Sequence, residues 1–405
     1  MKSRSLLLAC LFLLPACSLQ ERISATSSRI EQQYAEIKNW EDMPQRTISW
    51  NQAVAMMKRN NLEYLRTQQA IETAERNEMS VYTDSIPGVS YYGYFNESIS
   101  TLTKQINKVD INQNINVSFY LPSLTRLPYN VYSAKATVFA NKKAQEGTER
   151  ELVSKLYAMQ RKYEIQNRKN ALDKQNPEKK PDYLVVSKIE EDNDRWNEIA
   201  KLLGDYSARW VILPSSIPQF KWSNYRKLTG KLDDLVVCQF AMGLEQARLQ
   251  QYGVALSYLP TLNTSLYSPS LFTSTGGTYS GTFLDKDDTR LNFSASYTFD
   301  TDLKNWYRYC DNKEAYELKQ RETSQKLVEL KQKLHSLRSS MDEYYSWRSF
   351  MQKRLEYLRT AQAENAEEFL ENEKTIHSME RELLQQEETA VESEAALILQ
   401  YGLRA

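Results

Sequence analysis

The sequence of 405 residues contains little glycine and little proline, with 11 of each. It has no excess charge of either sign, because 52 basic side chains balance 52 acidic ones. This balance argues against a nucleic-acid-binding protein, since such proteins carry an excess of basic residues. Scarce turn-forming residues, together with 26 Tyr and 26% charged residues, favour long helices and some aromatic strands over a globular enzyme.

Motifs of the common enzyme classes are also missing. The sequence has no glycine-rich phosphate loop, no Cys and His cluster at metal-ligand spacing and no nucleophile elbow. His335 and His377 lie in helix-patterned stretches with no Cys or second His at ligand spacing, so we expect solvated helix residues. The sequence therefore predicts no catalytic site, no metal and no other cofactor.

The first sixteen residues have the pattern of a secretory signal. Two basic residues precede an apolar run at residues 6–14, which is too short to span a bilayer as a helix. The run ends in the sequence LPAC, which resembles a bacterial lipobox, so we predict removal of residues 1–16 and lipidation of Cys17, for example with palmitate. Ser18, in place of an Asp retention signal, favours the outer membrane. The alternative is an ordinary signal peptide that contains Cys17.

An internal duplication is visible in the mature chain. Pro87 and Pro260 each follow a helix-patterned stretch and open a strand-like one, and the same offset aligns Leu62 with Leu235. The order helix, strand, loop, strand, helix recurs after each alignment. We expect a lipid-anchored segment at 17–47, a first repeat of helix, two strands and two helices at 48–203, an equatorial mixed segment at 204–231 and a second such repeat at 232–403.

Alternating apolar and polar residues predict amphipathic strands at 111–121 and 291–300. Such a strand suits a membrane barrel, although the same alternation also suits a soluble sandwich. Four strands per chain cannot close a barrel, because about eight strands are needed. Three chains would give twelve strands. The polar positions, which would then face the lumen, are Asn112, Asn114, Asn116, Asn292, Ser294 and Ser296.

A heptad seam predicts a long coiled-coil helix after the last strand. No Gly or Pro occurs from Asp302 to about Glu364, so the helix would have about 60 residues and a length of roughly 90 Å. The last helix carries a matching apolar stripe, which predicts an antiparallel hairpin with a turn near Asn365 or, as second choice, Asn372. The seam residues are Leu327, Leu330, Leu334, Leu337, Met341, Tyr344, Met351, Leu355 and Leu358, and the stripe is Phe369, Ile376, Met379, Leu383, Ala390 and Leu397.

The first repeat predicts an equivalent hairpin at 128–203, with a turn in the proline-flanked segment 176–181. We expect its outgoing arm to be about a dozen residues shorter than that of the second hairpin. Trp210 and Trp222 in the equatorial segment favour a packed segment over a disordered linker. Cys238 and Cys310 lie too far apart on the predicted helices for a disulfide, so we expect two buried free thiols.

Several features of the chain together resemble the TolC-like outer-membrane efflux proteins. They are the lipobox, the helix that ends in X-Pro before a strand, the second alternating strand, the long hairpin and the repetition of this unit. The resemblance covers about residues 48–401. It implies a mainly α fold with a small β part, in which long antiparallel coiled-coil helices and four amphipathic strands form a duplicated unit. It further implies a homotrimer with a 12-stranded β-barrel that an α-helical barrel continues across the periplasm. The resemblance also implies a passive exit duct for substrates delivered by an inner-membrane pump and its periplasmic adaptor protein.

Acidic residues crowd the predicted second turn. Glu364, Glu367, Glu368 and Glu371, beside Asn365, would form a cation-selective ring or gate in a threefold assembly. A solvated acidic helix face is the alternative for these residues. For the whole chain, the competing hypothesis is a periplasmic coiled-coil structural lipoprotein without channel activity.

Overall fold

The computed structural model describes residues 21–35, 42–83, 88–99, 106–174, 194–258, 261–268, 273–275, 278–280, 290–296, 303–360 and 366–404. The predicted signal segment and Cys17 lie outside these residues. The chain divides into two compact units, one of Met1–Asn61 with Pro177–Ile217 and the other of Leu62–Asn176 with Pro218–Ala405.

The first unit has a small core under a two-stranded parallel sheet, in which β1 (Gln45–Ile48) pairs with β4 (Arg209–Ile212). Helix α2 (Trp50–Asn60) begins at a capping box formed by Ser49 and Gln52. A helix at residues 194–203 ends at Gly204, whose φ of +67° suits a residue without a Cβ atom. The core contains Ala53, Met57, Ile199, Leu203, Trp210 and Ile212. The buried Trp210 agrees with the expected packed segment.

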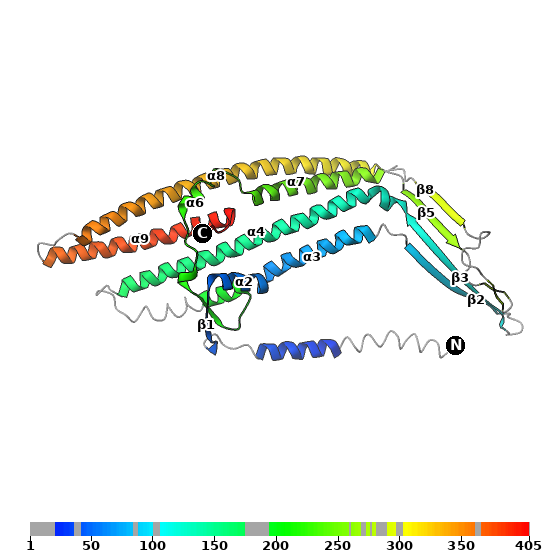
Figure 1. Ribbon diagram of the computed structural model, residues 1–405, viewed down its shortest axis with the longest axis horizontal. Coiled ribbons are helices and arrows are strands. Elements are labelled where there is room, and N and C mark those ends of the chain that lie inside the picture. The colour runs from blue at the N-terminus through cyan, green and yellow to red at the C-terminus, as the bar shows by residue number, and fades with distance from the viewer. Residues whose placement is uncertain are drawn as a thin grey trace. The chain divides into compact units, whose positions relative to one another are not determined.

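Long helices make up most of the second unit (Figure 1). They are α3 (Leu62–Thr83), α4 (Leu121–Lys174), α7 (Asp234–Ala255), α8 (Lys304–Thr360) and α9 (Ala366–Tyr401), with the short α6 (Trp222–Arg226). Helix α4 packs against α3, α7 and α9, while α8 packs against α7 and α9. The 57 residues of α8 confirm the long helix predicted from the heptad seam.

Burial along α8 confirms the predicted seam. Leu334, Met341, Met351 and Leu355 are buried, and the other seam residues are half-buried. In α9 the predicted stripe is also buried or half-buried, except that Phe369 is 56% exposed. Phe369 lies in the first turn of α9, shortly after residues 361–365, which are outside the described part of the chain.

Two expectations about the hairpins are wrong. Helix α4 has 54 residues and α8 has 57, so the outgoing arms are nearly equal. The difference arises because α4 continues through Pro128 and extends back to Leu121, although a proline inside a helix removes one hydrogen bond and clashes with the preceding turn. The second-choice turn is also wrong, since Asn372 lies inside α9. Asn365 falls between α8 and α9, outside the described residues.

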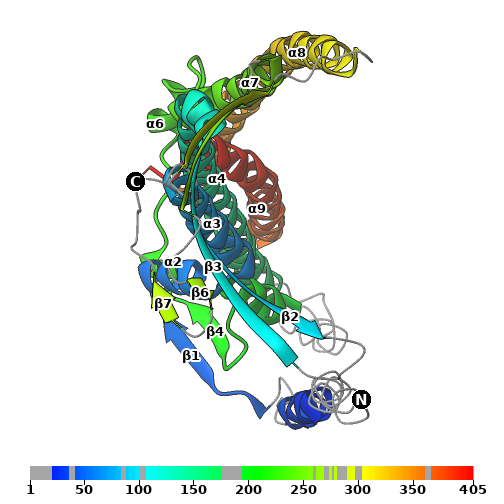
Figure 2. The same ribbon diagram turned by 90° about the vertical axis from the view of Figure 1, so that its right-hand side faces the viewer.

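A sheet lies at one end of the helices of the second unit (Figure 1). Its long strands are β2 (Gly88–Ile99), β3 (Ile106–Tyr120), β5 (Thr261–Ser268) and β8 (Arg290–Ser296), with the short β6 (Thr273–Thr275) and β7 (Thr278–Ser280). The long strands are antiparallel and adjacent in the order β2, β3, β5, β8. Figure 2 shows β2 and β3 side by side from the sheet end. Strand β3 ends one residue before Leu121, which was the predicted end of this strand. Leu121 instead begins α4.

Candidate functional site

The sheet joins the two sequence repeats. Strand β3 of the first repeat pairs with β5 of the second, so that Ile115 lies opposite Ser268 and Phe119 opposite Thr264. Among the described strands, β2 pairs only with β3, and β8 pairs only with β5. The sheet of long strands therefore begins and ends with an edge strand. The predicted lumen residues all lie in β3 or β8: Asn112, Asn114, Asn116, Asn292, Ser294 and Ser296.

Hydrogen bonds between α4 and α7 fix the helices close to this sheet. The Tyr129 hydroxyl donates to the Leu249 carbonyl at 2.7 Å, and the Arg126 guanidinium donates to the Leu256 carbonyl at 3.1 Å. The second bond satisfies a carbonyl in the 3₁₀ turn η3 (Leu256–Tyr258) that follows α7. A Cβ atom on Gly253 would lie 2.5 Å from the Tyr129 hydroxyl oxygen, so glycine permits this close approach. These contacts position β3 relative to β5.

The opposite end of α8 and α9 is held by an apolar cluster. Met351 and Leu355 of α8 pack with Met379 of α9, and Arg359 forms an ion pair with Glu380 across the hairpin. Glu371 is exposed, whereas Glu367 and Glu368 lie in the first turn of α9. Glu364 and Asn365 are outside the described residues. Acidic residues at a helix start interact favourably with the helix dipole, which gives this cluster a structural explanation as well.

An ionic network centred on a buried carboxylate joins α4 to α9. The Glu387 carboxylate, with a side chain 5% exposed, accepts from Arg161 at 2.9 Å and from Arg168 at 2.7 Å. Lys162 pairs with Glu392 and Lys169 pairs with Glu388 along the same seam. Sequence analysis missed this network, although Glu387 continues the spacing of the predicted stripe between Leu383 and Ala390, because that spacing does not identify a partner on another helix. The network ties a helix of the first repeat to the last helix of the second.

A second buried carboxylate, Glu394, lies about two turns further along α9. It is 6% exposed and accepts a hydrogen bond from the Tyr157 hydroxyl at 2.8 Å. Burial raises its pKa to about 7, and the nearby Glu387 carboxylate adds to the increase, while Tyr157, Arg161 and Arg348 oppose it. The side chain therefore holds a proton for part of the time near neutral pH.

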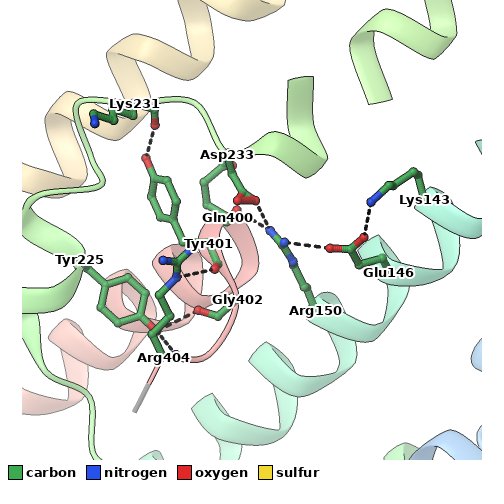
Figure 3. Close-up of polar contacts among 10 residues, drawn as sticks. All are labelled: Lys143, Glu146, Arg150, Tyr225, Lys231, Asp233, Gln400, Tyr401, Gly402 and Arg404. Atoms are coloured by element: carbon green, nitrogen blue, oxygen red, sulfur yellow. Dashed lines mark hydrogen bonds and ion pairs between the residues drawn. The ribbon is translucent and has the colours of Figure 1, made fainter. Parts of the chain in front are cut away.

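A further polar cluster ties the end of α9 to neighbouring segments (Figure 3). Arg150 of α4 donates to the Asp233 carboxylate at 2.5 Å, to Glu146 at 3.0 Å and to the Gln400 carbonyl at 3.0 Å. The Tyr401 hydroxyl donates to the Lys231 carbonyl at 2.9 Å, and the Tyr225 hydroxyl donates to the Gly402 carbonyl at 2.9 Å. Trp222 is 8% exposed and donates to Asp342 of α8 at 2.9 Å. This part of the equatorial segment is packed, as the aromatic residues predicted.

The cysteines and histidines differ in part from expectation. Cys238 and Cys310 are free thiols, as predicted, but both are half-buried where full burial was expected. His335 is exposed, whereas His377 is half-buried with its Nε2 atom 3.0 Å from the Leu172 carbonyl. Within the described ranges, no group of three or more His, Cys, Asp or Glu residues could hold a metal ion. No helix of that part of the chain is long and apolar enough to cross a membrane.

Comparison with solved structures places the fold. The outer membrane protein VceC of Vibrio cholerae superposes with a TM-score of 0.60 over 87% of this chain and 95% of that chain, at 12% identity. CusC, whose structures concern folding and transmembrane channel formation, gives a TM-score of 0.53 over 91% and 97% of the two chains, at 14% identity. The MtrE outer membrane channel of Neisseria gonorrhoeae gives 0.50 over 87% and 89%, at 14% identity. No family model and no curated protein sequence matches.

Proposed function

We propose that this chain, which has the TolC-like fold of outer-membrane efflux channels, is itself the outer-membrane exit duct of a tripartite efflux or type I secretion system. Three copies would form one channel. Substrates would reach it from an inner-membrane pump through a periplasmic adaptor protein. The chain would perform no covalent chemistry, and it would need no cofactor besides lipid on Cys17.

The observation that carries this proposal is the pair of edge strands in the sheet. Strands β2 and β8 stand at opposite ends of the series β2, β3, β5, β8. An edge strand has a row of unpaired backbone groups, and in a lipid core each such group costs several kcal/mol. Pairing β8 of one copy with β2 of the next removes both edges at once. Three copies then give twelve long strands, which is more than the eight needed for closure.

The helices supply the second part of the duct. Helices α4 and α8 have 54 and 57 residues, so each is roughly 80 to 85 Å long at 1.5 Å per residue. Both follow directly after strands of the sheet (Figure 1). A ring of such helices from three copies would continue the β-barrel as an α-helical barrel into the periplasm. Asn112, Asn114, Asn116, Asn292, Ser294 and Ser296 would line the barrel lumen.

Trimer formation and conductance test the proposal. Full-length protein extracted in detergent should run as a trimer that heating dissociates, and it should conduct in planar bilayers. Cysteine pairs in β2 and β8, in a background with Cys238→Ser and Cys310→Ser, should cross-link into trimers. Pairs in β3 and β5, which already lie side by side, should cross-link only within a monomer and serve as the control. Monomeric, non-conducting protein would instead support the structural lipoprotein.

The tip and the anchor need separate measurements. Glu367→Gln with Glu368→Gln should lower cation selectivity, measured as the reversal potential in a salt gradient, if the acidic residues form a ring. Glu382→Gln with Glu392→Gln, which removes the same number of charges from exposed positions further along α9, is the control. Unchanged cation selectivity would indicate that the acidic residues form a solvated helix face. Cys17→Ser should abolish incorporation of labelled palmitate, and continued labelling would exclude Cys17 as the lipid site.

A further inference from the structure

A groove lies between α8 and α9, beside the apolar cluster of Met351, Leu355 and Met379. Its volume is about 310 Å³, close to the lower end of the range for small-molecule sites, which is about 300 to 1,000 Å³. A space of this size suits one small molecule. The residues that line it come from both helices and are Ser340, Glu343, Tyr344, Trp347, Gln386, Thr389 and Ala390.

The groove exists because a small residue of α9 faces two large residues of α8. The apolar stripe of α9 has leucine at positions 383 and 397 but Ala390 between them, and Ala390 is buried. Its methyl group leaves space that a leucine would fill. On α8, Tyr344 and Trp347 are three residues apart and therefore lie on one side of the helix. Both are half-buried, so they form aromatic walls above a floor at Ala390.

Glu343 is the one charged residue among those that line the groove. It lies four residues before Trp347, on the same side of α8, and it is exposed. In the part of the chain that the structure describes, its carboxylate accepts one long hydrogen bond of 3.5 Å from the Ser339 hydroxyl and forms no ion pair. The adjacent Asp342, by contrast, pairs with Arg226 at 3.0 Å. The Glu343 carboxylate therefore remains available for a positive group.

The positive side chains on either side of the groove contact other groups. Arg348 follows Trp347 directly along α8 but does not line the groove. Its guanidinium forms a hydrogen bond with the Tyr344 hydroxyl and lies near the buried Glu394. Arg338, at the other end, lies 3.9 Å from the Asp342 carboxylate. Neither arginine neutralises Glu343.

We propose that this groove binds a small organic cation, such as a quaternary ammonium ion, with its positive centre between the Glu343 carboxylate and the Trp347 indole. A cation over an aromatic face is attracted by the ring quadrupole, and tryptophan gives the strongest attraction. Quaternary ammonium ions suit such walls because their surface is apolar and their charge needs no hydrogen-bond acceptor. The groove belongs to a single copy of the chain, so this inference does not depend on the proposed channel function.

Titration calorimetry with benzyltrimethylammonium tests the site directly. Full-length protein in a non-ionic detergent should bind this cation and should not bind benzenesulfonate, an anion with the same ring. Glu343→Gln changes an exposed residue and should weaken cation binding about fivefold, which corresponds to ~1 kcal/mol, the upper value for an exposed ion pair. Glu329→Gln is the matched control, because Glu329 is an exposed carboxylate two heptads earlier on α8 that does not line the groove.

Substitutions in the walls and floor give an independent measurement. Trp347→Leu should weaken binding of the cation about three- to tenfold, and Trp347→Phe should weaken it less, because phenylalanine retains an aromatic face. Ala390→Leu fills the groove without removing a charged or aromatic group and should abolish binding. Trp347 also packs against the apolar cluster, so thermal unfolding of each variant is measured to show that it is folded.

The outcomes separate this inference from the proposed function. Equal affinity of wild type and Glu343→Gln for the cation, or wild-type protein that binds benzenesulfonate as well as the cation, would overturn the proposal. Wild-type protein that binds no cation would overturn it too, and Trp347 shielded from aqueous acrylamide would then show that another chain covers the groove. Protein that binds the cation but does not conduct would remove only the proposed channel, whereas protein that conducts without binding would remove only the groove.

Discussion

Replacing Glu394 by Gln should remove a pH dependence from the stability of the α4–α9 seam. The folded-state pKa of Glu394 is raised to about 7 from its ordinary value of 4.5. Because the pKa is higher in the folded state, folding favours the protonated carboxyl group. The contribution of Glu394 to the free energy of unfolding is therefore fully present below about pH 4.5 and is lost as the pH rises through 7. At about 1.4 kcal/mol per pH unit, the full effect on the free energy of unfolding is ~3 kcal/mol.

The expected result has a definite sign. Wild-type protein should lose ~2 to 3 kcal/mol of stability between pH 5 and pH 8 through this residue alone. Gln cannot ionise. Its carbonyl oxygen can still accept the hydrogen bond that the Tyr157 hydroxyl donates to the wild-type carboxylate at 2.8 Å. Glu394→Gln should therefore match wild type at pH 5 and be more stable at pH 8.

Urea unfolding followed by circular dichroism at several pH values measures this difference. Glu382→Gln is the matched control, because Glu382 is an exposed carboxylate on the same helix. Comparing each variant with wild type cancels the titration of other groups. Identical pH dependence in wild type and Glu394→Gln would refute the argument that burial raises the pKa of this carboxylate.

Three further substitutions test the packing. Gly253→Ala should destabilise the junction beside the sheet by ~1 to 2 kcal/mol, because the new Cβ atom meets the Tyr129 hydroxyl; an unchanged thermal midpoint would contradict this. Gly204→Ala should cost at least ~2 kcal/mol in the first unit, since the backbone is left-handed there and the Cβ atom would overlap the Asn60 carbonyl. Faster proteolysis within residues 194–203 should reveal this loss of stability. A variant as resistant to proteolysis as the wild type would contradict the expected overlap. Met351→Ala should cost ~2 to 5 kcal/mol at the tip, measured as faster amide exchange in α8 and α9 but not in α7; uniform exchange would show that the cluster is not local.

Regular patterns made the helices and strands of this chain predictable. The spacing of Leu334, Met341 and Leu355 identified α8 because a coiled-coil seam repeats the same burial every seven residues. Alternation identified β3 to within one residue at its end because successive strand residues face opposite sides. The free thiols also followed from sequence, since helical rise sets the distance between positions.

Contacts between distant helices were not predictable in the same way. Glu387 and Glu394 continue the spacing of the predicted stripe between Leu383 and Leu397, but this spacing does not identify their partners on α4, which only the packing of α9 against α4 supplies. The parallel pairing of β1 with β4 was missed because four residues are too few for a visible alternation. The start of α4 was misplaced because Pro128 is an unfavourable helix residue that tertiary contacts override. Each failure concerns information that lies outside the local sequence.

The pairing of β3 with β5 has a consequence for biogenesis. Strand β3 gains β5 as a neighbour only when Ser268 is available to lie opposite Ile115, so the first half of the chain has an unpaired strand edge until the second half folds. Pairing of residues so far apart in sequence is slow, and an exposed edge is prone to aggregate in the meantime. If the chain is the proposed outer-membrane channel, we therefore expect it to depend on periplasmic chaperones, and we expect a chain truncated after α4 to be degraded.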